Sequence, residues 1–249
     1  MWRQRSGAAP LLILAHRGAS ALETENTAAA FARARADRAD GVELDVLLCA
    51  TGEVVVFHDD DLVRLANRPE RIGAMTWTAL RDVELPRGTR IPTLEEAVEA
   101  CGPDLLINVE LKAEGFAMSA FKELVDRTAA IVERMRIGAR VLVSSFNPLA
   151  VRLWMRRAPA VPAGLLFEAG SPLPLRQAWA APWLRPAALH PDVVLCRPDD
   201  VARWRRRGYM VNTWTVDDAA SLIAFRDMGV DGVITNDPAR ARAALTATT

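Results

Sequence analysis

Two of the three histidines in this chain stand where an apolar run meets polar residues. His16 ends the first such run and precedes Arg17, and His58 ends a later one and precedes Asp59. The unperturbed pKa of histidine lets it give or take a proton near neutrality. Because each histidine has a charged neighbour and one neighbour is an arginine, we predict acid–base chemistry on an anion.

Carboxylates occupy two other apolar runs. Glu43 and Asp45 lie two residues apart in 41–46, and Glu110 lies in 105–111. Residues two apart in a strand point to the same face. A carboxylate in a Val- and Leu-rich strand is costly to bury without a partner or a metal. Three carboxylates suit Mg²⁺ or Ca²⁺ better than zinc, so we predict one divalent cation on them. Structural ion pairing is the alternative.

Three other residues have a functional and a structural interpretation. Trp214 ends an apolar run, where an aromatic ring forms either a wall of the substrate site or part of the core. Phe146 has the same two interpretations. His190 also follows an apolar run and is either a residue of the rim or a buried structural histidine.

Apolar runs alternate with helical patterns along most of the chain. Runs rich in Val, Ile and Leu are typical of parallel strands buried on both faces. The expected strands are 11–15, 41–46, 54–57, 105–111, 140–145, 163–167, 187–190, 209–216 and 230–234. Capping and turn residues precede the expected helices, which are 27–38, 93–101, 119–136, 148–157, 199–207, 217–228 and 238–246.

One connection reduces the nine expected strands to eight parallel ones. The turn Thr51-Gly52-Glu53 leaves no room for the crossover of about a dozen residues that parallel neighbours need. Residues 54–57 should therefore return antiparallel, as the second arm of a hairpin. The remaining strands predict an α/β fold, a TIM (β/α)8 barrel with a small insertion after the second strand. We expect one domain over 1–249, with 59–91 as the insertion and a short helix at 76–82.

Such a barrel brings the candidate residues together. Active sites of TIM barrels lie at the carboxyl ends of the strands. The first strand ends at His16, the second carries Glu43, and the hairpin returns His58 toward the end of the second. Glu110 and Lys112 lie two apart on another strand, so both face one side. Four separate segments should therefore meet at one rim.

Bulk composition excludes several classes of protein. The chain of 249 residues is half apolar, which suffices for a large core, and its net charge of zero gives no argument for nucleic acid. The three cysteines favour reduced packing residues in a cytoplasmic protein. The first apolar stretch, 11–15, is too short for a signal segment or a membrane span, so we expect no membrane insertion. The sequence leaves the oligomeric state open.

Taken in order, the motifs resemble those of the glycerophosphodiester phosphodiesterase family over nearly the whole chain. The matching segments are His16-Arg17-Gly18, Glu25-Asn26-Thr27, Glu43-Leu44-Asp45, Thr51-Gly52-Glu53, His58-Asp59, Ile91-Pro92-Thr93-Leu94-Glu95-Glu96, Glu110-Leu111-Lys112, Trp214-Thr215-Val216 and Gly232-Val233-Ile234-Thr235-Asn236-Asp237-Pro238. The resemblance also implies a TIM barrel with a small insertion after the second strand. It implies a divalent metal on Glu43, Asp45 and Glu110, an acid–base pair of His16 and His58, and phosphate contacts from Arg17 and Lys112.

The implied reaction is metal-dependent hydrolysis of glycerophosphodiesters, such as glycerophosphocholine or glycerophosphoethanolamine, to sn-glycerol 3-phosphate and an alcohol. We expect His16 to be the base and His58 the acid. The nucleophile is either water or the neighbouring glycerol hydroxyl, which would give a cyclic intermediate. One alternative is a lysophospholipase D-type enzyme on lysophospholipids, which the Pro-, Trp- and Leu-rich stretch 168–186 leaves open. Another is a non-catalytic barrel that binds phosphometabolites.

Overall fold

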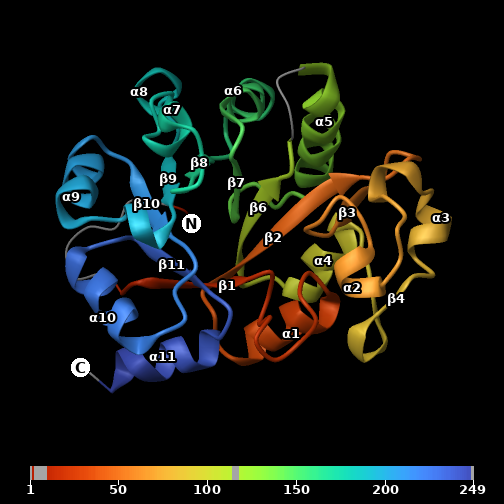
Figure 1. Ribbon diagram of the computed structural model, residues 1–249, viewed down its shortest axis with the longest axis horizontal. Coiled ribbons are helices and arrows are strands. Elements are labelled where there is room, and N and C mark those ends of the chain that lie inside the picture. Colours follow the sequence, from red (N-terminus) through yellow and green to blue (C-terminus); the bar gives the residue numbers. More distant parts are fainter. Residues whose placement is uncertain (1, 3–9, 114–117, 248–249) are drawn as a thin grey trace.

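The computed structural model describes residues 2, 10–113 and 118–247, and parallel strands form a closed barrel at its centre (Figure 1). The strands of the barrel are β1 (Leu12–His16), β2 (Gly41–Leu48), β6 (Leu106–Leu111), β7 (Val141–Ser145), β8 (Ala163–Phe167), β9 (Ala188–Pro191), β10 (Met210–Thr213) and β11 (Gly232–Thr235). Each strand pairs in parallel with its neighbours, and β1 closes the circle by pairing with both β2 and β11. The predicted TIM barrel is confirmed.

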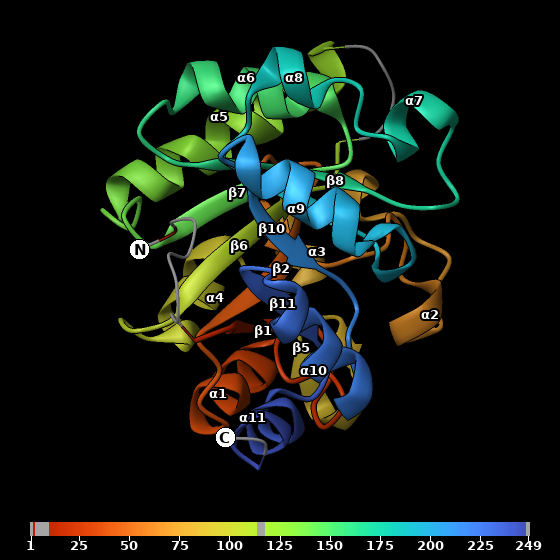
Figure 2. The same ribbon diagram turned by 90° about the vertical axis from the view of Figure 1, so that its left-hand side faces the viewer.

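Helices surround the barrel in both views (Figures 1 and 2). They are α1 (Ala28–Ala36), α4 (Leu94–Cys101), α5 (Met118–Arg134), α6 (Pro148–Arg157), α9 (Pro198–Arg206), α10 (Ala219–Met228) and α11 (Pro238–Thr246). The expected capping residues begin several of them: the Thr27 side chain accepts from Ala30 N–H, and Thr93 forms a capping box with Glu96. Among the described residues, no helix is both long and apolar enough to cross a bilayer.

Two short helices, α7 (Leu173–Arg176) and α8 (Ala181–Leu184), stand between β8 and β9 in place of one longer helix. The sequence predicted no element in this stretch. Prolines at 172, 174, 182 and 186 explain the interruption, since proline cannot donate the backbone hydrogen bond that a helix interior requires. Short helices of this kind carry no periodicity that a sequence pattern can reveal.

The second strand continues into the predicted hairpin. β3 (Val54–Val56) runs antiparallel to β2, with Val46 opposite Val56. The insertion that follows contains α2 (Val63–Ala66), η1 (Ile72–Ala74), α3 (Trp77–Leu80), β4 (Glu84–Leu85), η2 (Pro86–Gly88) and β5 (Thr89–Arg90). Only α3 corresponds to the short helix expected at 76–82. The insertion has a core of its own around Phe57, Leu62, Ile72 and Leu80.

Alternate residues of the strands fill the barrel. Leu14, Leu142 and Met210 belong to one buried cluster. His190 of β9 is fully buried, with Nε2 3.1 Å from Asn212 Nδ2, so it is an interior residue and not part of the rim. Gly164 leaves the space that this ring needs, because a β-carbon there would lie 2.9 Å from His190 Nε2. Burial lowers the pKa of His190 to about 3.

Candidate active site

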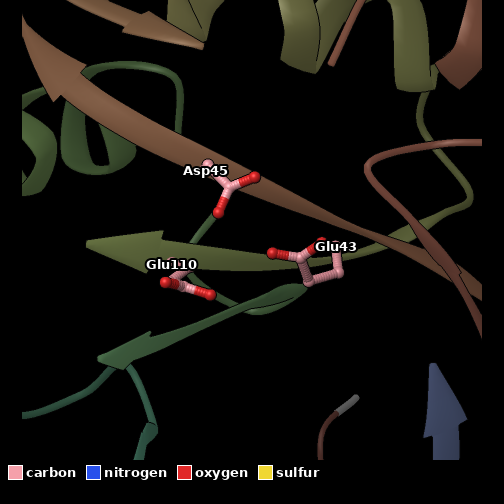
Figure 3. Close-up of side chains that lie close together, drawn as sticks. All are labelled: Glu43, Asp45 and Glu110. Atoms are coloured by element: carbon pink, nitrogen blue, oxygen red, sulfur yellow. The ribbon is translucent and has the colours of Figure 1, made fainter. Parts of the chain in front are cut away.

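The strand register brings the three predicted carboxylates together at the carboxyl end of the barrel. Asp45 of β2 is level with Glu110 of β6, and Glu43 is level with His16 of β1. All three carboxylates are buried, and one ligand oxygen from each lies within 4.8 Å of the others. Figure 3 shows the side chains turned toward one another. The structure thus brings the acidic triad together as the sequence predicted.

Burial, together with repulsion from neighbouring carboxylates, disfavours ionisation of two acids of this triad. Burial raises the pKa of Glu43 well above its ordinary value, and the charges of Asp45 and Glu110 raise it further. Burial and the nearby charge of Asp45 also raise the pKa of Glu110, to about 7, although Lys112 opposes the shift. Each shift means that the ionised carboxylate is disfavoured at this position. A bound cation would remove that penalty, so the residues present fit a divalent ion with oxygen ligands.

Two basic side chains compensate part of the negative charge. Lys112 Nζ lies 2.9 Å from Glu110 Oε1 and 3.4 Å from Asp45 Oδ1. Arg17 Nε lies 3.3 Å from Asp45 Oδ2, and the Arg17 backbone N–H donates to Glu43. Arg17 and Lys112, predicted as phosphate contacts, therefore touch the triad directly.

His16 is held by a residue from the far end of the chain. Its Nδ1 lies 2.7 Å from Asn236 Oδ1, which also accepts from Ser20 Oγ. Asn236 Nδ2 donates to Asp217, so the amide orientation is fixed and its oxygen faces His16. Nδ1 of His16 consequently carries the hydrogen, which leaves Nε2 free to accept a proton. Burial lowers the pKa of His16, and the positive charge of Arg17 lowers it further.

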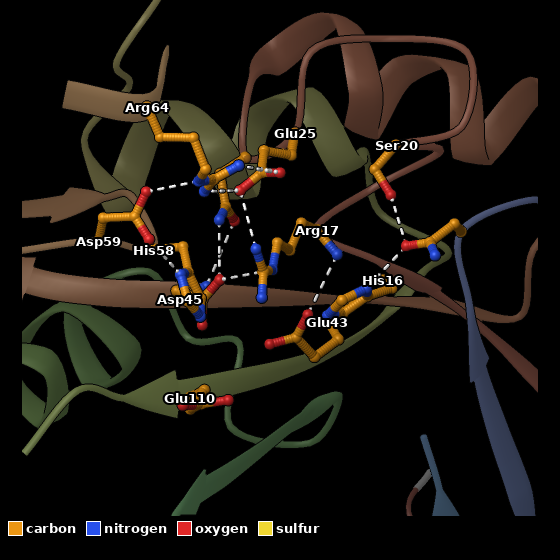
Figure 4. Close-up of polar contacts among 12 residues, drawn as sticks. His16, Arg17, Ser20, Glu25, Glu43, Asp45, His58, Asp59, Arg64 and Glu110 are labelled. Carbon is orange, nitrogen blue, oxygen red and sulfur yellow. Dashed lines mark hydrogen bonds and ion pairs between the residues drawn. The ribbon is translucent and has the colours of Figure 1, made fainter. Parts of the chain in front are cut away.

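His58 has a charged support. Its Nδ1 lies 2.7 Å from Asp59 Oδ1, and Arg64 Nε donates to the other oxygen of Asp59 (Figure 4). The backbone N–H of Phe57 donates to Asp45 O, which places His58 beside the Asp45 side of the triad. Burial lowers the pKa of His58, which the opposing charge of Asp45 only partly offsets. Both histidines are therefore mainly neutral at pH 7 and anchored through Nδ1.

Several supporting residues were assigned no role from the sequence. Asn26 Nδ2 donates to Asp45 Oδ2, and Glu25 accepts from both Arg17 and Arg64. Burial raises the pKa of Glu25, but hydrogen bonds from Arg64 and the charge of Arg17 outweigh that effect and lower it to about 2. The sequence did carry a signal here, since Glu25 and Asn26 belong to one of the matching motifs. Arg64 had none, because it lies in the insertion.

A cavity of about 190 Å³ opens over these residues. Its polar lining comprises His16, Arg17, Glu43, His58, Glu110, Lys112 and Glu168, and its apolar lining comprises Phe146, Leu166, Trp214 and Ile234. Trp214 and Phe146 meet edge to face, with ring centroids 5.5 Å apart. The two aromatic residues that were ambiguous in the sequence thus line the site. Glu168 was not predicted, because nothing in its sequence neighbourhood distinguishes it from a surface acid.

Comparisons with known proteins agree with this geometry. A family model, the glycerophosphoryl diester phosphodiesterase family, matches residues 16–240. A glycerophosphodiester phosphodiesterase of Caldanaerobacter subterraneus subsp. tengcongensis is 33% identical over 91% of this chain and 94% of its own.

Solved structures show the same fold. A putative glycerophosphoryl diester phosphodiesterase from Silicibacter pomeroyi has a TM-score of 0.88 at 24% identity, covering 98% of this chain and 96% of that one. An Oleispira antarctica phosphodiesterase, solved with the product sn-glycerol-3-phosphate, has a TM-score of 0.84 at 25% identity over 94% and 96%. The relative from Caldanaerobacter subterraneus subsp. tengcongensis is named as a glycerophosphodiester phosphodiesterase, which gives no support to a non-catalytic barrel. The chain therefore belongs to the glycerophosphoryl diester phosphodiesterase family, a family of hydrolases.

Proposed function

We propose that the protein hydrolyses glycerophosphodiesters to sn-glycerol 3-phosphate and an alcohol, with a divalent cation, Mg²⁺ or Ca²⁺, at the acidic triad. The observation that carries this proposal is the buried triad with one anchored histidine on each side. His16 is level with Glu43 in the sheet, whereas His58 lies beside Asp45. The relative from Oleispira antarctica binds sn-glycerol-3-phosphate, the product that this reaction would release.

The charges of the site match a phosphodiester. Glu43, Asp45 and Glu110 carry three negative charges when ionised, and Arg17 and Lys112 return two positive ones. With a divalent cation bound, the triad and these two basic residues would together carry one positive charge in excess, which a phosphodiester monoanion neutralises. Matching of this kind favours binding of the anion in a site of low dielectric.

Glu43, Asp45 and Glu110 would hold the cation through their oxygens. When bound, a divalent cation polarises a phosphoryl oxygen and stabilises charge that develops there. Asn26 fixes one oxygen of Asp45 by its hydrogen bond, and the backbone of Arg17 fixes one oxygen of Glu43. Such supporting hydrogen bonds orient metal ligands before the ion binds.

The two histidines would divide the proton transfers. In an in-line displacement the attacking and leaving oxygens lie on opposite sides of phosphorus, which requires one proton carrier on each side. We propose that His16 Nε2 accepts the proton of the nucleophile, and that His58 protonates the leaving alcohol. A general acid must be protonated before it acts, and Asp59 beside His58 Nδ1 raises the His58 pKa against the larger lowering by burial, which increases the protonated fraction of a ring that is mainly neutral at pH 7. Arg17 and Lys112 would hold the phosphoryl oxygens from the same wall.

The direct test is turnover of glycerophosphocholine, measured as release of sn-glycerol 3-phosphate, with added Mg²⁺ or Ca²⁺. Lysophosphatidylcholine serves as the second substrate, because it tests the lysophospholipase D-type alternative. One feature favours that alternative, namely the apolar side of the cavity, which is formed by Phe146, Leu166 and Trp214. We expect faster turnover of glycerophosphocholine, since a cavity of about 190 Å³ has little space for an acyl chain. Exclusive turnover of the lysolipid would contradict the proposal.

Asn236 should position His16 for this reaction. We expect Asn236→Ala to lower kcat about tenfold, because the loss of one hydrogen bond frees the imidazole. The hydrogen bond from Asn236 also raises the pKa of His16. Its removal should therefore move the acid limb of the pH–rate profile to lower pH. Ser20→Ala, which removes a different bond to the same oxygen, serves as the control with turnover within about twofold. An unchanged pH profile in Asn236→Ala would reject the positioning role.

A further inference from the structure

We propose that Glu168, with the aromatic pair Phe146 and Trp214, forms a subsite for a cationic alcohol group of the substrate, such as choline or ethanolamine. This inference rests on the proposed hydrolysis of glycerophosphodiesters and adds which of them the enzyme prefers. Its basis is an acidic side chain that lines the cavity on the wall opposite Arg17.

The strand order places Glu168 across the barrel from Arg17. Glu168 directly follows β8, and β8 lies four strands from β1 in either direction around the closed barrel. Arg17 follows β1 on the far side of the circle, whereas Lys112 follows β6, which lies two strands from both β1 and β8. Both Arg17 and Glu168 nevertheless line the same cavity. A phosphodiester held by Arg17 and Lys112 would therefore extend one of its two substituents toward Glu168.

The carboxylate of Glu168 has no partner of its own among the described residues. No hydrogen bond or ion pair of this side chain is found there, and it is partly exposed. The other acids of the site differ in this respect: Asp45 and Glu110 contact Lys112, and Glu25 contacts Arg17. An uncompensated carboxylate facing the cavity repels the phosphate anion, whereas it attracts a cation carried by the same substrate. It also lies outside the group of oxygens that gather within 4.8 Å at the metal site.

The aromatic residues beside Glu168 suit a quaternary ammonium group. Trp214 donates its Nε1–H to His190 O at 2.9 Å, which fixes the indole and leaves its ring to line the cavity. Phe146 packs against it at an interplanar angle of 86°. Aromatic faces attract ammonium groups through their quadrupole, and Leu166 supplies an apolar contact for methyl groups. Glycerol is neutral and hydroxyl-rich, so these groups fit the alcohol better than the glycerol.

The experiment compares cationic with neutral alcohols in matched variants. The substrates are glycerophosphocholine and glycerophosphoethanolamine, which carry a cation, and glycerophosphoglycerol, which does not. In Glu168→Gln we expect kcat/KM for both cationic substrates to fall about fivefold, mainly through a higher KM. The loss is limited because a partly exposed ion pair and a cation–π contact each contribute modestly to the binding free energy. Turnover of glycerophosphoglycerol should stay within about twofold of the wild type.

The control variant is Asp199→Asn, which removes one negative charge from the exposed start of α9. It should leave the preference among the three substrates unchanged. An equal loss for all three substrates in Glu168→Gln would overturn the inference, because Glu168 would then contact the shared glycerol phosphate. An unchanged preference would overturn it as well. Both results leave the proposed reaction intact, whereas a wild type that hydrolyses none of the substrates refutes the reaction itself.

Discussion

Replacing either His16 or His58 by alanine is expected to lower kcat for glycerophosphocholine at least about 10²-fold, the low end for general acid–base catalysis. Each ring is anchored through Nδ1, His16 to Asn236 and His58 to Asp59, so a single nitrogen of each is left for proton transfer. Neither side chain belongs to the packed core, and the variants should keep the melting temperature of the wild type within a few degrees. Steady-state kinetics with thermal unfolding would measure both quantities.

The third histidine, His190, gives a control variant in which stability is expected to fall. His190 is fully buried inside the barrel, so His190→Ala should lower the free energy of unfolding through the cavity it leaves. Near-normal turnover in His16→Ala or in His58→Ala would reject the pair.

The same variants distinguish the base from the acid. A p-nitrophenyl ester of glycerol 3-phosphate has a leaving group that needs no protonation. It should restore much of the rate in the variant that lacks the acid, which we expect to be His58→Ala, and little in His16→Ala. The reverse pattern would exchange the two roles.

Removing the metal, or one of its ligands, should have the second large effect. We expect exhaustive chelation to abolish most turnover of the wild type, and Glu110→Gln to lower kcat at least about 10²-fold even with added Mg²⁺ or Ca²⁺. The glutamine keeps the shape of Glu110 but removes one of three crowded charges. Added cation should raise the melting temperature of the wild type but not of Glu110→Gln. Undiminished turnover after complete metal removal would contradict the metal role.

The pH dependence of stability checks the same triad without any activity measurement. The pKa of Glu110 is about 7 in the folded protein, above its ordinary value of 4.5. A carboxyl group with a raised pKa binds more protons in the folded state, so stability is present below pH 4.5 and lost as pH rises toward 7. Over the same range the lowered pKa values of His16, His58 and His190 act in the opposite direction, because these rings stay neutral in the folded protein but are protonated in the unfolded chain at pH 5. Comparison of the two proteins isolates the contribution of Glu110: between pH 5 and pH 8 the free energy of unfolding of metal-free Glu110→Gln should rise relative to that of the metal-free wild type by on the order of 1–3 kcal/mol.

Much of the fold was predictable because local patterns reported it directly. Buried parallel strands appear as continuous apolar runs, and the Thr51-Gly52-Glu53 turn excluded a crossover, which gave the hairpin that returns His58. One-turn elements were not predictable. The insertion and the stretch between β8 and β9 consist of such pieces, which are fixed by packing around side chains such as Leu62 and Ile72. Expected strand 209–216 was too long at its carboxyl end, since β10 ends at Thr213.

The supporting contacts of the site join residues that are far apart in the sequence. Asn236 lies 220 positions from His16, and Arg64 lies 39 from Glu25. Neither pair shares a local pattern, so no spacing rule joins its members. The sequence showed which residues were able to carry protons or bind a cation, but their partners required the closed barrel.

The sequence by itself determined which reactive groups are present and in what order the elements that carry them follow. These groups are two histidines beside charged residues and three carboxylates in apolar strands, and the alternation of strands and helices places them at one rim. These features are local, because residue type and periodicity fix them. Only the tertiary structure decided the pKa values and the interaction partners of these groups. The raised pKa of Glu110, the fixed amide of Asn236 and the carboxylate of Glu168, which has no partner in the described part of the chain, arise from through-space distances and burial, which no linear spacing contains.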